Sequence, residues 1–264
     1  MFYQVRNLWQ TNGFIRQLIA PISLPYNHSD RGTKMEFFAF LADPWFVTSW
    51  YFIGVGGAGW ALYDMLFVNT AVNPPLKAAW PIIIFFFSVL GLAFYFWTCR
   101  PSGVGDMTEK EKKEKHKEYV DNTFYKTNGA LIHCVGGDGL GIVTAMIVLR
   151  LSNVTFWQEF WVEYAVGFAF GWIIFQLWAF LLQDNDILTA LFKAFRAEFF
   201  SMASVMIGMG LVMAQITPRV VGAAPPPDTF AFWGFASFGL LVGAILTFPV
   251  NYALIKLGWK HGMS

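Results

Sequence analysis

Long apolar runs separated by short polar stretches dominate the pattern of this chain. A helix needs roughly 20 mostly apolar residues to cross a hydrocarbon layer of about 30 Å. Six stretches reach this length, and the run from Ile82 to Trp97 contains no charged residue. We therefore expect six membrane-spanning helices, at 44–67, 78–99, 129–149, 155–182, 195–216 and 229–256.

The polar stretches predict two further parts. Residues 1–42 lack the apolar core of a secretory signal peptide. Within them, residues 5–20 mix apolar side chains with two arginines, which favours a segment lying on the membrane surface over an organellar presequence. In the loop 100–128, Thr108 and Glu111 form a capping-box pattern that predicts a short exposed helix. The expected fold is an all-α integral membrane protein, with an N-terminal extension (1–42) before a six-helix bundle (43–264).

Composition agrees with this fold and narrows the function. Hydrophobic residues make up 56% of the 264 and charged residues only 13%, whereas soluble domains carry about a quarter charged residues. The net charge of +1 gives no reason to expect a nucleic-acid partner. Cys99 and Cys134 lie at or inside apolar runs, so a disulfide framework is not expected. P-loop, G-x-S-x-G, CxxC and HExxH motifs are absent from the sequence, and we expect no catalytic activity of the chain's own.

The distribution of Lys and Arg predicts an orientation. Fifteen of them fall on one predicted side, in the N-terminal extension, the 100–128 loop, the connection before the fifth run and the C-terminal end. Only Lys77, Arg150 and Arg219 fall on the other side. Cytoplasmic loops are enriched in Lys and Arg. With an even number of spans, both termini are therefore expected in the cytoplasm.

Pairs of glycines four residues apart recur in three of the runs. They are Gly137 and Gly141, Gly167 and Gly171, and Gly239 and Gly243. Small residues at this spacing let helix backbones approach each other closely in lipid. We interpret these glycines as packing positions rather than as part of a nucleotide-binding loop, because no strand precedes them.

Polar residues inside the apolar runs are the main functional clue. Ionisable groups in lipid are costly and mark functional sites by default. At a rise of about 1.5 Å per residue, several such groups fall within the inner half of the bilayer in four different runs. Cys134 and Asp138 share a helix face because they are four residues apart. The set comprises His133, Cys134, Asp138, Gln176, Glu198 and Asn251.

A stripe of methionines extends this set. Met202, Met206, Met209 and Met213 lie on one face of the fifth run, and Glu198 lies one turn before Met202. Thioethers and thiolates are soft ligands that suit Cu(I). Two alternatives stay open, since methionines at helical spacing are usually core filler and buried polar residues often only join helices by hydrogen bonds. The candidate ligands of a copper-type metal are His133, Cys134, Asp138, Glu198 and Met202.

Four stretches of the chain give it a family resemblance. They are Tyr63-Asp64, Ala79-Trp80-Pro81, Gly129 to Gly141 with its His133-Cys134 pair, and Phe248 to Tyr252 followed by Leu254-Ile255-Lys256 and Gly258. With these, the chain from about Met35 to Met263 resembles an uncharacterised prokaryotic membrane family, domain of unknown function 4396. The resemblance implies a polytopic helical fold in a prokaryotic inner membrane and implies no particular activity.

The chain departs from the family pattern at positions that would matter for a metal site. Asp138 stands where the family has a second cysteine, and Ile142 stands where it has an aspartate. The acidic residue midway along the family's fifth helix has no counterpart here, unless Glu198 replaces the one nearer the helix start. If the family residues bind a metal, these departures imply a different metal or none.

We therefore favour a non-catalytic accessory or scaffold subunit of a larger membrane complex, with other membrane proteins as partners besides the lipid bilayer. The alternative is a protein that binds or transports a transition metal, copper first, at an inner-leaflet site. A third hypothesis is proton or ion translocation through the inner carboxylates, which requires a connected path from the outer side.

Overall fold

The computed structural model describes residues 36–152, 154–177, 181 and 186–260 of the chain. The chain divides into two units, 1–37 and 38–264, and all that follows concerns the second unit. The extension predicted to lie on the membrane, residues 5–20, falls outside the described residues. Every regular element in the described part is helical, in the following order. The helices are η2 (Glu36–Ala42), α2 (Pro44–Phe67), α3 (Pro74–Thr98), η3 (Val104–Asp106), α4 (Glu109–Asp121), α5 (Thr123–Arg150), α6 (Phe156–Ala169), the π-helical η4 (Phe170–Gln176), α8 (Ile187–Gly210), the π-helical η5 (Leu211–Ile216), α9 (Thr217–Val221) and α10 (Phe230–Lys256).

Side-chain caps fix where most of the long helices begin. The carboxylate of Asp43 accepts a hydrogen bond from the backbone N–H of Phe46 at 2.8 Å, at the start of α2. Asn122, Asp186 and Thr229 cap α5, α8 and α10 in the same way. Such caps satisfy backbone donors that have no partner inside the helix. The polar residues between the apolar runs therefore define the helix ends.

Helix α3 is broken in its middle. Ser88 has φ 50° and ψ −127°, a conformation outside the helical region. The Ser88 hydroxyl donates to the backbone carbonyl of Trp50 at 2.6 Å, and the Trp50 indole N–H donates to the carbonyl of Phe86 at 2.8 Å. In lipid, backbone groups freed by a break need partners from the protein. The Trp50 indole of α2 is such a partner for the carbonyl of Phe86.

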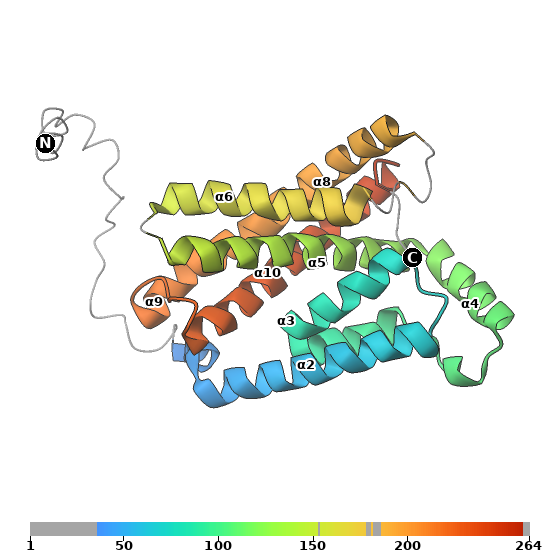
Figure 1. Cartoon of the computed structure of the whole chain (residues 1–264), viewed down its shortest axis with the longest axis horizontal. Coiled ribbons are helices and arrows are strands. Elements are labelled where there is room, and N and C mark those ends of the chain that lie inside the picture. The colour runs from blue at the N-terminus through green and yellow to red at the C-terminus, as the bar shows by residue number, and fades with distance from the viewer. Residues whose placement is uncertain (1–35, 153, 178–180, 182–185, 261–264) are drawn as a thin grey trace, which may run out of the picture. The chain divides into compact units, whose positions relative to one another are not determined.

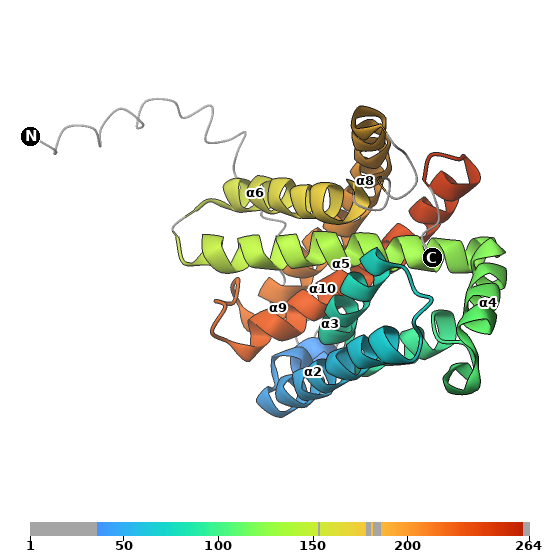
Figure 2. The same ribbon diagram turned by 45° about the vertical axis from the view of Figure 1, so that its right-hand side comes forward.

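The break reverses the chain, so that both ends of α3 lie at the same end of the bundle. The rings of Trp80 and Tyr95 are 5.2 Å apart, although a straight helix would separate these residues by about 22 Å. Just after α3, Arg100 forms an ion pair with Asp64 near the end of α2 at 3.1 Å. Figures 1 and 2 show the two halves of α3 running back along each other beside α2.

Four described helical stretches are long and apolar enough to cross a membrane by length and composition: α3, α5, Ile187–Val221 and α10. The predicted count of six spans is therefore not confirmed. The predicted span at 78–99 falls within α3, but α3 is not one continuous helix, because it folds back at Ser88. Hydropathy alone cannot detect this reversal. Gly91 permits it, since a Cβ there would lie 2.9 Å from the Cα of Ile84.

Helices α2 and α10 run in the same direction. Near their starts, the hydroxyls of Tyr51 and Ser237 are hydrogen-bonded at 2.6 Å. Near the end of α10, the ring of Phe248 lies 5.8 Å from Phe124 at the start of α5, and Phe124 lies 5.7 Å from Trp97 at the end of α3. The start of α2 and the end of α10 therefore lie at opposite ends of the bundle, and the placement of both termini in the cytoplasm stays a prediction. The reason for the opposite ends is the reversal in α3, which returns the chain to the end of the bundle where α2 ends.

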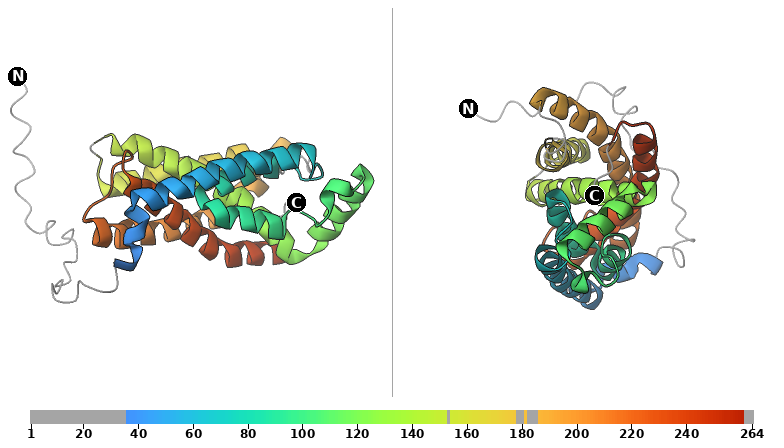
Figure 3. Two further views of the ribbon diagram at one scale, coloured as in Figure 1. Left: turned by 90° about the horizontal axis from the view of Figure 1, so that it is seen from below. Right: turned by 90° about the vertical axis from the view of Figure 1, so that its right-hand side faces the viewer.

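Helix α5 lies in the middle of the bundle and contacts α3, α6, α8 and α10 (Figure 3). The predicted glycine pairs make these contacts close. A Cβ on Gly141 would lie 2.7 Å from the Cα of Gly167, and a Cβ on Gly137 would lie 3.0 Å from the Cα of Gly171. Gly243 of α10 lies against Gly208 of α8. The interpretation of these glycines as packing positions is confirmed.

Candidate functional site

A cluster of buried polar side chains lies where α5, η4, α8 and α10 meet. It consists of Cys134, Asp138, Glu198, Ser201, Asn251 and Lys260, each at most 2% exposed. The surrounding core is largely apolar, so these groups replace water mainly with one another and with nearby backbone such as the carbonyl of Ala197. Ionisable residues at such positions are expensive and mark functional sites by default.

Lys260 enters the cluster because the chain turns back after α10. Gly258 has φ +68°, which favours glycine, and the backbone N–H groups of Gly258 and Trp259 donate to the carbonyls of Ile255 and Leu254 at 3.0 and 2.9 Å. This pattern is a Schellman motif, which commonly ends helices. The turn carries Lys260 back along the helix that precedes it and into the bundle.

The ammonium of Lys260 has three partners from three different helices. It donates to Cys134 Sγ at 2.8 Å, to Ser201 Oγ at 2.7 Å and to Asn251 Oδ1 at 2.9 Å. Ser201 in turn donates to the same Asn251 oxygen at 2.7 Å. A lysine ammonium has three donors, and all three are used here. Lys260 therefore occupies a preformed site for a cation.

Two carboxylates complete the cluster beside Gly171 of η4. Asp138 Oδ1 and Glu198 Oε1 both occupy the space where a Cβ of residue 171 would be, so any larger residue here would displace both carboxylates. The Cys134 thiol donates to Glu198 Oε2 at 3.2 Å. Among the described residues, no donor reaches Glu198 Oε1 or either oxygen of Asp138. Two adjacent carboxylates in a medium of low dielectric constant favour a proton or another cation between them.

The structure brings together much of the set that the sequence predicted. Cys134, Asp138, Glu198 and Asn251 lie in one cluster, as expected from their common depth. Met202 is buried in the apolar core one turn from Glu198, and its methyl group lies against Gly167. The side chain of Gln176 lies outside the described residues.

His133 is buried, and its ring lies edge-on to the ring of Phe175 with centroids 5.4 Å apart. Within the described residues, no three His, Cys, Asp or Glu side chains gather as a metal-binding group. A ligand set of His133, Cys134, Asp138, Glu198 and Met202 therefore stays a prediction. The position among Cys134, Ser201 and Asn251 is taken by Lys260 in this structure.

Sequence reasoning missed three members of the site: Lys260, Ser201 and Gly171. Lys260 follows the last apolar run and counts there as one more positive residue of the cytoplasmic side. The only signal that could have identified it is Gly258, which predicts a helix end but not the direction of the residues after it. Gly171 was interpreted as a packing residue, which it is, but its missing side chain also makes room for two carboxylates.

Comparison with known proteins gives one match. The family model described as Domain of unknown function (DUF4396) matches residues 123–260. No curated protein and no solved structure matches the chain. The matched region starts with α5 and ends at Lys260, so it contains every residue of the buried cluster. It is shorter than the expected region from about Met35 to Met263, and it leaves out α2 and α3.

Proposed function

Since the chain belongs to the DUF4396 family, which brings no activity with it, we propose from the geometry alone that this membrane protein binds a monovalent cation and moves it across the bilayer. The observation that carries the proposal is the ammonium of Lys260, held inside the bundle by Cys134, Ser201 and Asn251 beside two carboxylates. In this proposal Lys260 is an internal cation that a transported cation displaces.

The energetics argue against a purely structural cluster. Well-packed apolar residues in place of a buried ion pair are often as stable or more stable, by about 1–4 kcal/mol. A bundle that needs only helix packing has no use for two carboxylates, a thiol and a lysine at its centre. A transport site needs them, because it must hold a cation in lipid and also release it.

The position of Lys260 suits reversible displacement. Lys260 belongs to the short turn after α10 and not to a helix, so its side chain can withdraw without a shift of α5 or α8. Its withdrawal would leave the Cys134 thiol and the carboxylates of Asp138 and Glu198. A thiolate and carboxylates accept a proton, and a thiolate also binds a soft monovalent metal ion such as Cu(I).

The distribution of Lys and Arg suggests how the bundle is oriented in the membrane. The end of the bundle formed by α4, the start of α5 and the end of α10 carries most Lys and Arg residues of the described part. Lys77 also belongs there, because its ammonium donates to the carbonyl of Thr70 beside α4. Arg150 and Arg219 lie at the other end. We place the basic end in the cytoplasm of a prokaryotic cell, which puts the start of α2 outside.

The test is cation uptake by the full chain reconstituted in phospholipid vesicles, with a pH-sensitive dye and a Cu(I)-responsive dye trapped inside. We expect proton or Cu(I) uptake above that of protein-free vesicles. Asp138→Asn should reduce the rate of cation uptake at least tenfold. Lys260→Met and Lys256→Met form a matched pair, because the first removes a buried ammonium and the second removes an exposed one. The absence of both fluxes in the wild type, or equal rates in Asp138→Asn, would overturn the proposal.

A further inference from the structure

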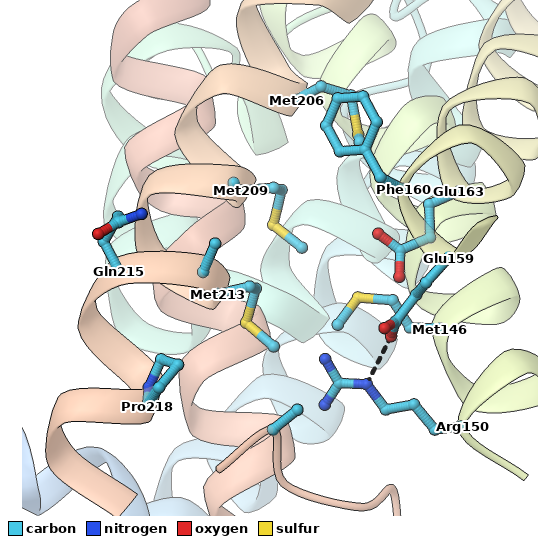
Figure 4. A pocket seen from close by; sticks show the side chains of 13 residues that line it. Met146, Arg150, Glu159, Phe160, Glu163, Met206, Met209, Met213, Gln215 and Pro218 are labelled. Atoms are coloured by element: carbon cyan, nitrogen blue, oxygen red, sulfur yellow. Dashed lines mark hydrogen bonds and ion pairs between the residues drawn. The ribbon is translucent and has the colours of Figure 1, made fainter. Parts of the chain in front are cut away.

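A second site lies at the opposite end of the bundle, in a cavity of about 360 Å³ between α5, α6 and α8. Figure 4 shows four methionine side chains, two carboxylates and an arginine around this space. We propose that this cavity, called here the methionine cavity, binds a soft monovalent metal cation, Cu(I) or its analogue Ag(I). The residues that carry the argument are Met146, Met206, Met209, Met213, Glu159 and Glu163.

The sulfur chemistry selects the class of metal. Met206 and Met209 come from α8, Met213 comes from η5, and Met146 comes from α5. Three of the four are at most 3% exposed: Met146, Met206 and Met209. Thioethers are soft, uncharged ligands that prefer Cu(I) to hard cations. Sulfur atoms from two sides of one cavity therefore favour a soft ion.

The charges around the cavity suit a single positive charge. Arg150 is engaged by Glu159 at 2.8 Å, its guanidinium lies 5.3 Å from the ring of Phe232, and it also donates to the carbonyl of Pro225. Glu163 lies one turn from Glu159 and forms no ion pair within the described residues. Glu159 balances the charge of Arg150, and Glu163 is a further carboxyl group lining the cavity that can release a proton when a cation binds.

Core filling alone does not explain this arrangement. Met146, Met206 and Met209 belong to the hydrophobic core, and with Met213 they also line an open space of about 360 Å³ beside two carboxyl groups. Filler methionines also have no reason to surround carboxylates. The cavity is lined by Pro218 and Ala224 as well, which belong to the end of the bundle that we assign to the outer side. A cation could thus enter from that side.

The methionine cavity deepens the proposed function without depending on it. Met202 continues the stripe from Met206 towards Glu198, so α8 connects the cavity to the lysine-containing cluster. If cations cross the membrane, the methionine cavity is the outer station of that path. If no cation crosses, binding in the cavity can still be measured by itself.

The test is anaerobic titration of the detergent-purified full chain with Cu(I) in competition with a coloured chelator, and with Ag(I) by calorimetry. The matched variants replace thioethers by apolar side chains of similar volume. Met206→Leu with Met209→Leu changes the cavity, whereas Met65→Leu changes a fully buried methionine of α2. Cys134→Ser changes the inner cluster only. Thermal unfolding establishes that each variant is folded.

We expect one tightly bound equivalent in the wild type and at least a tenfold loss of affinity in the double leucine variant, with the affinity of Met65→Leu unchanged. Three results would overturn the inference: no binding by the wild type, equal loss in Met65→Leu, or loss in Cys134→Ser together with full binding by the double variant. The last result would overturn the methionine cavity but leave the proposed inner cation site in place. Loss of vesicle uptake with intact metal binding would overturn the proposed function but leave the methionine cavity in place.

Discussion

At the scale of single residues, the site depends on one glycine and one lysine. Because Gly171 has no side chain, the carboxylates of Asp138 and Glu198 fill the space beside it. Lys260 places a positive charge next to Cys134. Gly171 thus affects the site through space, and Lys260 affects it through charge. Their effects can therefore be separated by substitutions that change space without charge, or charge without much space.

Gly171→Ala tests the effect of space. Its methyl group would overlap the two carboxylates, so we expect a loss of about 1–3 kcal/mol in the free energy of unfolding, as is typical of overpacking. Thermal unfolding in detergent, followed by tryptophan fluorescence, measures it. Gly56→Ala is the control, because a Cβ at Gly56 has open space around it. An unchanged midpoint in Gly171→Ala would contradict the described geometry.

Lys260→Met tests the effect of charge. Removing one partner of a buried charged group is expected to cost about 3–5 kcal/mol, because the remaining charges lose their counter-ion. Combining Lys260→Met with Glu198→Gln should restore at least half of that loss, since the carboxylate no longer needs the ammonium. Chemical unfolding of the two variants and of Lys256→Met gives the comparison. Additive losses would show that Lys260 and Glu198 do not interact.

At the scale of helices, the ends of the elements were more predictable than their paths. The pattern Thr108–Glu111 predicted a helix, and α4 begins there with Thr108 N–H donating to Glu111 at 2.7 Å. The same reasoning could not foresee that α3 reverses at Ser88. A lone serine in an apolar run fits a straight helix equally well, and only the contact of Ser88 with Trp50 of α2 distinguishes the two.

The cap of α4 predicts a dependence on pH. Hydrogen bonds from the Thr108 side chain and backbone lower the pKa of Glu111, so ionised Glu111 is favoured in the folded state. This stabilisation is fully present above the unfolded pKa, about 4.3, and is lost as the pH falls through the lower folded value. Hydrogen-exchange protection of residues 109–113 should fall a few-fold on acidification. In Glu111→Gln, protection should already be lower at neutral pH and change little with acid.

At the scale of the whole molecule, the expected depth of polar residues in the membrane predicted which of them meet. The number of apolar runs was a poorer guide to the topology. Cys134, Asp138, Glu198 and Asn251 were expected to converge because they lie at one depth, and they do. The turn that inserts Lys260 was not predictable, because a residue beyond the last span has no depth of its own in the sequence. A hydropathy profile detects apolar runs, so it cannot show that α3 folds back at Ser88.

Single-cysteine labelling tests the resulting topology. With Asn73→Cys, Lys113→Cys, Pro44→Cys and Asp228→Cys in right-side-out vesicles, we expect a bulky maleimide to modify the last two and to leave the first two unmodified. A straight α3 would instead place positions 73 and 113 on opposite sides. The wild type gives the background, because Cys99 and Cys134 are buried.

The prediction that the chain is an accessory subunit concerns the molecule as a whole and stays open, since nothing in the described residues identifies a partner. If it holds, mild-detergent purification from native membranes should yield the same additional polypeptides in constant ratio from wild type and from Asp138→Asn. Mass spectrometry of the purified material would identify them. A chain that elutes alone from both preparations would count against the accessory role.

The break at Ser88 also has a consequence for biosynthesis. The hydroxyl of Ser88 and the carbonyl of Phe86 find their partners in α2, which the ribosome completes before α3. The α2–α3 pair can therefore settle in the bilayer while the rest of the chain is still being made. At about 5–20 residues per second, α10 follows on the order of ten seconds later. The broken helix thus has its hydrogen-bond partners in α2 already in place while α5 to α10 are translated.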